Sequence, residues 1–223
     1  MLRKIASYLP RGTQDEIKRL MFRHQIRRGT FVSDEPEFVS VSLYLHAGDT
    51  VIDVGANVGH YTLQLSKAVG PTGRVIALEP MPETFEILTA NMRAARAFNV
   101  TLLNLAASCR SGSVRMSLPK WDNGNDNFYQ AAIAAAGDYQ VLCAPLDLFK
   151  LSKVALLKVD AENHDLEVLQ GAESLIRRDM PTVIVENGRH GPIADWLLAR
   201  GYSLSMAHGS PNCVAVKAGG ELT

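Results

Sequence analysis

The sequence is poor in cysteine and has no long apolar run. Its three cysteines, Cys109, Cys143 and Cys213, are widely spaced and form no CxxC pair. This excludes a disulfide framework and a zinc site, and it is typical of a reducing, cytoplasmic setting. No stretch approaches the roughly 18 consecutive apolar residues that a membrane-spanning helix requires. Arg3 and Lys4 are not followed by an apolar segment, so no signal peptide is predicted.

A net charge is also absent, because 23 Lys and Arg residues balance 23 Asp and Glu residues. With 47% hydrophobic and 21% charged residues, the composition is globular and excludes a disordered or collagen-like chain. A length of 223 residues fits one α/β domain.

The charge is unevenly distributed along the chain. Residues 1–28 contain eight basic and two acidic residues, a balance of +6 that leaves −6 for the rest. Within this segment, Ile17, Leu20 and Met21 have the spacing of an amphipathic helix. A basic arm over residues 1–32 can contact an anionic surface or another subunit. Alternatively, it is a solvated helix that docks on its own acidic domain.

Segments typical of strands and helices alternate along the rest of the chain. The predicted strands cover residues 50–54, 74–79, 100–106, 154–160 and 182–186, and the predicted helices cover 61–69, 82–97, 165–178 and 193–200. This βαβ spacing predicts an α/β fold whose mostly parallel sheet has helices on both faces. Residues 202–207 and 212–217 predict a terminal hairpin.

The remaining segments predict smaller elements. Helices are expected at 13–28 and from residue 33 or 34 to about 46. Residues 113–118 and 140–144 indicate a short extra β pair. The pair flanks a loop, residues 119–138, that contains Trp121, Phe128 and Tyr129. Such a loop can form a lid that stacks on a sugar ring, or it can anchor itself to the core.

A glycine-containing loop follows the first of these strands and opens a helix. It holds Gly55, Asn57 and Gly59 in a GxNxG pattern, with Asp53 two residues before the first glycine. A dinucleotide site has GxGxxG to receive a pyrophosphate, whereas Asp53 repels phosphate and suits a cation such as S-adenosylmethionine. Glu79, twenty residues after Gly59, ends the next strand, where it can accept hydrogen bonds from ribose hydroxyls. This order of acid, loop, helix, strand and acid predicts an adenosyl cofactor.

Longer motifs lie in and around these elements. They are VIDVGANVGHYT at residues 51–62, VIALEP at 75–80, NLAAS at 104–108, LKVDAE at 157–162, EVLQG at 167–171 and VIVE at 183–186. From about residue 35 to 201, the chain resembles the FkbM-type S-adenosylmethionine-dependent methyltransferases. The resemblance implies a class I (Rossmann-like) methyltransferase domain over residues 33–223, with a seven-stranded sheet whose last strand is antiparallel. It also implies O-methylation of a hydroxyl on a sugar, glycan or similar metabolite.

The cofactor side of the site follows from these motifs. The residues expected around S-adenosylmethionine are Asp53, Gly55, Ala56, Asn57, Gly59, Glu79, Pro80, Asn104, Ala106 and Asp160. One departure from the family pattern concerns the acceptor side. The family usually has glycine after the Asp-x-Glu acid, where this chain has Asn163.

The acceptor side is expected at the C-terminal ends of the later strands. A hydroxyl needs a base or a metal ion to lower its pKa before methyl transfer. We expect Asp160 and Glu186, with Asn187 or His164, to activate the hydroxyl. Asp160, Glu186 and Asn187 can alternatively hold Mg²⁺, and His164 can instead be a surface residue that starts a helix. Lys158 is expected to pair with Asp160 or Glu186, or to orient an anionic acceptor.

Other classes of protein fit the sequence less well. It lacks the (D/N)PP(Y/F/W) motif of amino-methylating nucleic-acid enzymes, and Cys143-Ala-Pro145 reverses the Pro-Cys order of C5-pyrimidine enzymes. A nucleic-acid partner is therefore disfavoured, and the missing GxGxxG disfavours an NAD-dependent dehydrogenase. A non-catalytic adenosyl-binding partner protein stays as an alternative, and so does a methyltransferase with a nitrogen or nucleic-acid acceptor.

Overall fold

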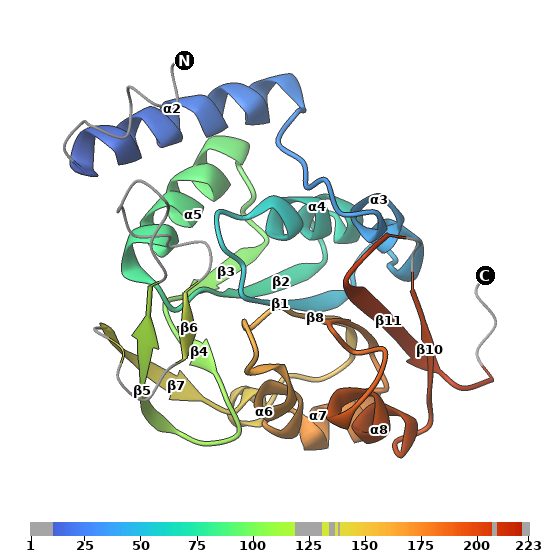
Figure 1. The fold of residues 1–223 in the computed structure, drawn as a ribbon. Helices are drawn as coiled ribbons and strands as arrows, with labels where there is room; N and C mark the ends of the chain where they lie inside the picture. The colour runs from blue at the N-terminus through green and yellow to red at the C-terminus, as the bar shows by residue number, and fades with distance from the viewer. Residues whose placement is uncertain (1–10, 119–130, 134–136, 138, 207–208, 220–223) are drawn as a thin grey trace.

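A seven-stranded sheet forms the centre of the computed structural model, which describes residues 11–118, 131–133, 137, 139–206 and 209–219 (Figure 1). Its strands are β1 (Thr50–Val54), β2 (Arg74–Leu78), β3 (Val100–Leu103), β8 (Val154–Val159), β9 (Thr182–Glu186), β10 (Tyr202–Ser205) and β11 (Asn212–Lys217). Their order is β10-β11-β9-β8-β1-β2-β3. Neighbouring strands are parallel except for β11, which is antiparallel to β9 and to β10. The predicted sheet with an antiparallel last strand is confirmed.

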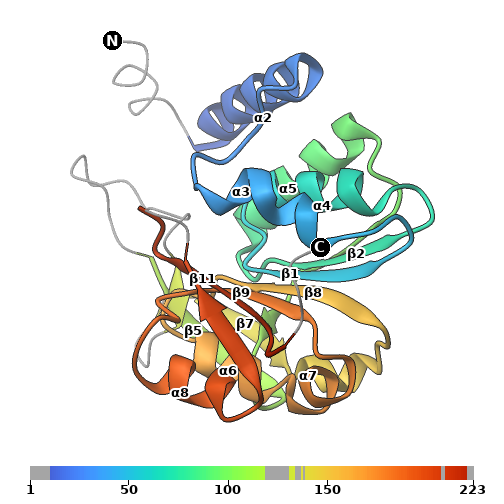
Figure 2. The same ribbon diagram turned by 90° about the vertical axis from the view of Figure 1, so that its right-hand side faces the viewer.

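Helices cover both faces of the sheet (Figure 2). One face carries α3 (Glu37–Ser40), the 3-10 helix η1 (Val41–Tyr44), α4 (His60–Val69) and α5 (Pro82–Ala95), and the other carries α6 (Asp165–Gln170), α7 (Glu173–Asp179) and α8 (Pro192–Leu198). The central strands are nearly continuous apolar runs because they are buried from both sides. The three-layer arrangement leaves the strand ends as the places where polar groups can meet a ligand.

A second sheet lies beside the C-terminal end of β3. It contains β4 (Ala106–Ala107), β5 (Gly112–Ser117), β6 (Ala132–Ile133) and β7 (Tyr139–Ala144) in the order β4-β7-β5-β6. The expected extra β pair is β5 and β7, which are antiparallel. The single strand predicted for residues 100–106 is wrong, because β3 ends at Leu103. The Asn104 amide donates hydrogen bonds to the Glu79 and Pro80 carbonyls and turns the chain into the second sheet.

Two predicted helices are also wrong in extent. The helix expected over 165–178 is interrupted between α6 and α7 at Gly171, where a Cβ would lie 2.1 Å from the Ser108 carbonyl oxygen. The helix expected from residue 33 or 34 to about 46 is reduced to α3 and η1. Its buried residues Phe38 and Val41 are three positions apart, a spacing that suits the tighter 3-10 turn.

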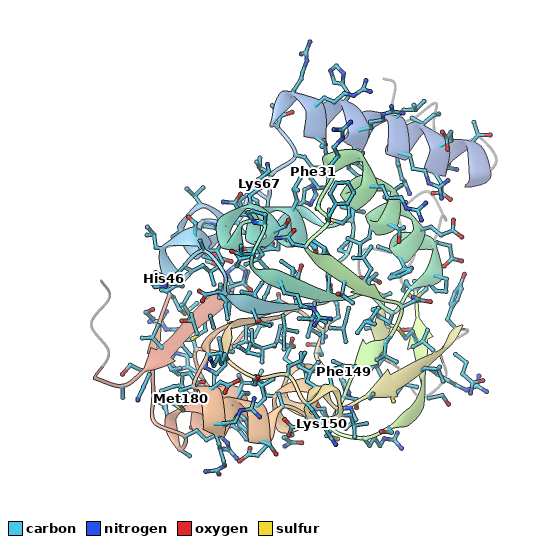
Figure 3. All side chains as sticks on the ribbon, turned by 180° about the vertical axis from the view of Figure 1, so that it is seen from behind. Phe31, His46, Lys67, Phe149, Lys150 and Met180 are labelled. Atoms are coloured by element: carbon cyan, nitrogen blue, oxygen red, sulfur yellow. The ribbon has the colours of Figure 1, made fainter. Side chains whose placement is uncertain are left out.

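The basic arm forms α2 (Arg11–Arg28), which lies against α5 (Figure 1). Phe22 is its buried anchor, and its ring packs edge-on against Phe31 with 5.5 Å between centroids. Phe31 lies between α2 and α4 (Figure 3) and stacks on His60 at 4.1 Å. The apolar face expected at residues 17, 20 and 21 is not buried, because these residues are 43%, 58% and 45% exposed. Tertiary packing selects the opposite side of the helix.

No helix in the part of the chain that the structure describes has the length and apolar character needed to cross a membrane.

The Phe22 anchor makes a stability prediction. We expect Phe22→Ala to lower the free energy of unfolding by about 3 kcal/mol, because it empties a packed aromatic site between α2 and α4. Met21→Ala, one residue away but 45% exposed, is the matched control, and its effect is expected to stay within about 0.5 kcal/mol. Urea unfolding followed by circular dichroism measures both. Equal effects of the two substitutions would contradict the docking of α2 through Phe22.

Candidate active site

A pocket opens at the C-terminal ends of β1, β2 and β8. About 610 Å³ of space, part of it open solvent, lies between its walls. The strand order reverses direction at β1, because β2 and β8 lie on its two sides, and ligands of open α/β sheets bind at such a point. Six residues predicted around the cofactor line the pocket: Gly55, Asn57, Glu79, Pro80, Ala106 and Asp160.

The apolar wall of the pocket was missed by the sequence analysis. It is formed by Leu105, just before β4, Met116 of β5, Ala131, just before β6, and Ile133 of β6. These residues come from the second sheet and the segments that lead into it, and they carry no motif that distinguishes them from ordinary core residues. An alternating apolar pattern over β5 is the single sequence signal that they leave.

The turn after β1 requires glycine at position 55. Gly55 has φ +73°, and a Cβ at this position would lie 1.9 Å from the Asp160 carbonyl oxygen. The loop backbone and the end of β8 can therefore approach each other only without a side chain between them. Gly59 has φ +98°, but its missing Cβ makes room for Leu88 and Met92 of α5. It serves helix packing and does not line the pocket, and neither does Ala56.

Glu79 is fixed by the backbone at the rim of β2. It is 6% exposed, and its two carboxylate oxygens accept hydrogen bonds from the Asn57 and Met81 N–H groups, each at 2.9 Å. Burial raises the pKa of Glu79 to about 7, although the two backbone hydrogen bonds act in the opposite direction. Each oxygen keeps a lone pair for a further donor. The Asn104 amide fixes the backbone that carries this acid, because it donates hydrogen bonds to the Glu79 and Pro80 carbonyls.

Asp53 lies beneath the pocket and does not line it. It is fully buried, its Oδ2 accepts a 2.6 Å hydrogen bond from the Thr62 hydroxyl, and its Oδ1 has no hydrogen-bond partner. Burial raises the pKa of Asp53, against the nearby charge of Lys158. The sequence predicts that Asp53 contacts a cationic ligand directly. In the structure, the Asp53 side chain lies below the loop and is not part of the pocket wall.

Lys158 forms the expected ion pair with Asp160. Its Nζ is 3.1 Å from the Asp160 Oδ2 and lies 4.8 Å from the centroid of the Tyr61 ring. Burial lowers the pKa of Lys158, but the charges of Asp160 and Asp53 outweigh this and raise it overall. The ammonium group is therefore charged and committed to two acids. Its position holds the Asp160 carboxylate at the pocket wall.

Several further carboxylates surround the end of β8. Glu162 lines the pocket, and burial together with Asp160 and Glu186 raises its pKa to about 6. Burial also raises the pKa of Glu186, with added repulsion from Asp160 and Asp165. Glu186 itself, like Asn187, lies outside the pocket wall. Among the described residues, no group of three or more His, Cys, Asp or Glu is arranged to hold a metal ion.

Asn163 stands where the family usually has glycine, and the structure explains the departure. Its φ is +71°, a left-handed conformation that asparagine adopts more readily than most other residues. The turn that follows Glu162 is therefore available without glycine.

His164 contacts Ser108 and Glu167. Its Nε2 is 3.0 Å from the Ser108 hydroxyl and its Nδ1 is 3.6 Å from Glu167. It does not line the pocket wall, so the expected role of a base beside the acceptor is not supported. The fold brings Ser108 and His164 together across 56 residues of sequence.

A second polar network lies next to Lys158 and was missed by the sequence analysis. The Tyr61 hydroxyl is 2.7 Å from Glu35 Oε2 and 3.2 Å from Glu37 Oε1. The Asn212 amide donates to the same two carboxylates. No sequence signal links Asn212 to Glu35, because 177 residues separate them. The aromatic residues Trp121, Phe128 and Tyr129 of the expected lid lie outside the described residues.

The sheet order, the antiparallel last strand and a carboxylate after β2 define the class I, Rossmann-like methyltransferase fold. The FkbM methyltransferase domain model matches residues 53–204. The chain therefore belongs to the FkbM family of S-adenosylmethionine-dependent methyltransferases.

Similar proteins include a hexuronic acid methyltransferase. The hexuronic acid methyltransferase AglP of Haloferax volcanii is 28% identical over 200 residues, which cover 83% of this chain and 73% of that protein. The crystal structure of a methyltransferase FkbM from Methylobacillus flagellatus superposes with a TM-score of 0.57 at 17% identity, covering 76% of this chain and 43% of that one. A precorrin-6y C5,15-methyltransferase from Geobacter metallireducens gives 0.53 at 16% identity, covering 84% and 90%. These structures share the fold.

The contact between Gly55 and Asp160 makes a binding prediction. We expect Gly55→Ala to weaken S-adenosylmethionine binding by at least about tenfold, because the new Cβ forces the ends of β1 and β8 apart. Gly70→Ala is the matched control, since Gly70 has φ +67° but no atom within 4 Å of the place where a Cβ would lie. It is expected to cost roughly 1 kcal/mol of stability and to leave the affinity unchanged. Calorimetric titration of both variants measures this, and equal affinities would contradict it.

Proposed function

We propose that this protein transfers a methyl group from S-adenosylmethionine to a hydroxyl of a sugar or glycan. The observation that carries the proposal is the pocket in which Glu79 on one wall and Asp160 on another flank the Gly55 turn. The 28% identity to a hexuronic acid methyltransferase supports a sugar as the acceptor.

The residues of the pocket fit the cofactor. Glu79 has both oxygens positioned by backbone N–H groups, so it is ready to accept hydrogen bonds from the two ribose hydroxyls. The apolar wall around Ala106 and Met116 suits an adenine ring. Asp160 and Glu162 place negative charge near the sulfonium and ammonium groups. S-adenosylmethionine, when bound, supplies an electrophilic methyl group.

Asp160 is the proposed base for the acceptor. The Lys158 ammonium donates a 3.1 Å hydrogen bond to its Oδ2, which fixes the orientation of the carboxylate. An ionised carboxylate at the pocket wall can take the proton from a hydroxyl as the new carbon–oxygen bond forms. Dependence on Mg²⁺ through Asp160, Glu186 and Asn187 is the alternative form of this step, and dialysis against EDTA distinguishes the two.

The pKa of Glu79 sets the expected pH dependence of cofactor binding. Ribose hydroxyls donate to the ionised carboxylate, so protonation of Glu79 competes with binding as the pH falls through about 7. We expect the affinity for S-adenosylmethionine to be constant above this pH and to fall by up to about tenfold per unit below it. Glu79→Gln should bind more weakly and lose this dependence between about pH 6 and 8, roughly one unit on either side of that pKa. Calorimetry over the pH series tests it, and a wild-type profile that matches the variant would refute the role of Glu79.

Asp160→Asn tests the catalytic role directly. The substitution keeps the shape and an acceptor for Lys158 but removes the base, so we expect turnover at saturating S-adenosylmethionine to fall by at least about 10²-fold. Asp195→Asn, on the exposed face of α8, is the control with unchanged turnover. Transfer of labelled methyl to glycan fractions or cell extract measures the rate. Full activity of Asp160→Asn would contradict this assignment, and cofactor binding without any transfer would favour a non-catalytic adenosyl-binding protein.

A further inference from the structure

A serine, a histidine and a glutamate from separate segments meet next to the pocket. The Ser108 hydroxyl is 3.0 Å from His164 Nε2, and His164 Nδ1 is 3.6 Å from Glu167 Oε2. This is the order of groups in a hydrolytic triad. Ser108 is 1% exposed, however, and neither Ser108 nor His164 lines the pocket. The hydroxyl is therefore closed to a substrate, and what the three residues connect defines their role.

The contact between Ser108 and His164 joins two walls of the pocket. The strand β4 comes directly before Ser108, and both of its residues line the pocket. Ala161 and Glu162, in the turn that leads to His164, line it as well. The distance between these two walls therefore depends on whether Ser108 and His164 stay in contact.

Ser108 is the fixed end of this contact. Its N–H donates a 3.1 Å hydrogen bond to the Ala144 carbonyl of β7. Its carbonyl oxygen lies against Gly171, where a Cβ would be only 2.1 Å away. The backbone of Ser108 is held between β7 and the end of α6, so its hydroxyl is a fixed point to which the turn after β8 can be attached.

The turn after β8 is attached at its start and at its end. At the start, the Asp160 N–H donates a 3.1 Å hydrogen bond to the Val54 carbonyl of β1. Within the turn, the His164 N–H donates to the Ala161 carbonyl, and Asp165 Oδ1 accepts a 2.8 Å hydrogen bond from the Ala161 N–H. These internal bonds fix the shape of the turn. Its position relative to β4 is set by the side chain of His164.

The conformation of this turn is unfavourable without support. Glu162 and Asn163 are consecutive and have φ +48° and +71°. Left-handed backbone is disfavoured for residues other than glycine, although asparagine tolerates it better than most. Such a conformation persists where surrounding contacts impose it, and the contact of His164 with Ser108 is one that joins the turn to a rigid neighbour.

We infer that His164 is a positioning residue. Through Ser108 it holds the turn of residues 161–163 beside β4, and it thereby fixes the width of the pocket for S-adenosylmethionine. The inference rests on the proposed function for the identity of this ligand. Glu167 is at the exposed end of the group and contributes little to the width.

Two substitutions of His164 separate the reach of its side chain from its presence. A glutamine amide extends about as far as Nε2 and still meets the Ser108 hydroxyl, whereas the shorter asparagine amide corresponds to Nδ1 and does not reach it. We expect His164→Asn to weaken S-adenosylmethionine binding about five- to tenfold, as for loss of one buried hydrogen bond. His164→Gln should stay within about twofold of wild type, because it keeps that bond. Glu167→Gln is the matched control, with unchanged affinity.

A double-mutant cycle identifies Ser108 as the partner. Ser108→Ala removes the other side of the contact and should weaken binding as much as His164→Asn. The double variant should bind no more weakly than either single variant, because both substitutions remove the same hydrogen bond. Calorimetric titration of the full-length protein with S-adenosylmethionine measures each affinity, at a temperature where circular dichroism shows every variant to be folded.

The outcomes separate this inference from the proposed function. Unchanged affinity in His164→Asn and Ser108→Ala overturns the inference even when both variants unfold at lower temperature, since a purely structural contact gives that result. Equal weakening by His164→Gln and His164→Asn, or additive effects in the cycle, overturns action through Ser108. Wild-type protein that does not bind S-adenosylmethionine refutes the proposed function itself, before any variant is compared.

Discussion

A buried ammonium group has to be balanced by acids, and Lys158 imposes this requirement on the centre of the sheet. The side chain is 4% exposed on β8, and it is neutralised by Asp160 at its tip and by Asp53 on the neighbouring strand. An unpaired charge at this depth would cost several kcal/mol. The pairing therefore holds Asp160 at the pocket wall and keeps Asp53 under the glycine turn, so that one lysine links the cofactor side to the acceptor side.

The two sides of the pocket are built by different means. On the cofactor side, backbone groups do most of the positioning: Gly55 lets two strand ends touch, and the Asn57 and Met81 amides orient Glu79. At the proposed acceptor position, side chains from distant segments lie near the ends of β8 and β9. Rigid backbone suits a cofactor that every member of a family shares, whereas side chains on separate segments can change with the acceptor.

The position of Glu35 has a consequence for how the N-terminal part of the chain is viewed. The segment that follows α2 is attached to the helix layer through Phe31 and to β11 through the contact of Glu35 with Asn212. Docking of α2 on α5 and the contact of Phe22 with Phe31 therefore stabilise the segment that leads to Glu35. The arm is connected to the site by packing, independently of any contact with an anionic surface.

The sequence by itself determined the parts that depend on local pattern. Strand and helix alternation predicted the sheet and its layers, and the motifs around Gly55, Glu79 and Asp160 identified the family and most of the polar pocket wall. Tertiary structure decided what depends on contacts between distant residues: the burial of Asp53, the turn of His164 toward Ser108, the apolar wall from the second sheet, and the meeting of Glu35 with Asn212. Local sequence specifies which conformation a segment prefers and which face is apolar, but the partner of a polar side chain is fixed only when strands far apart in the chain come into register.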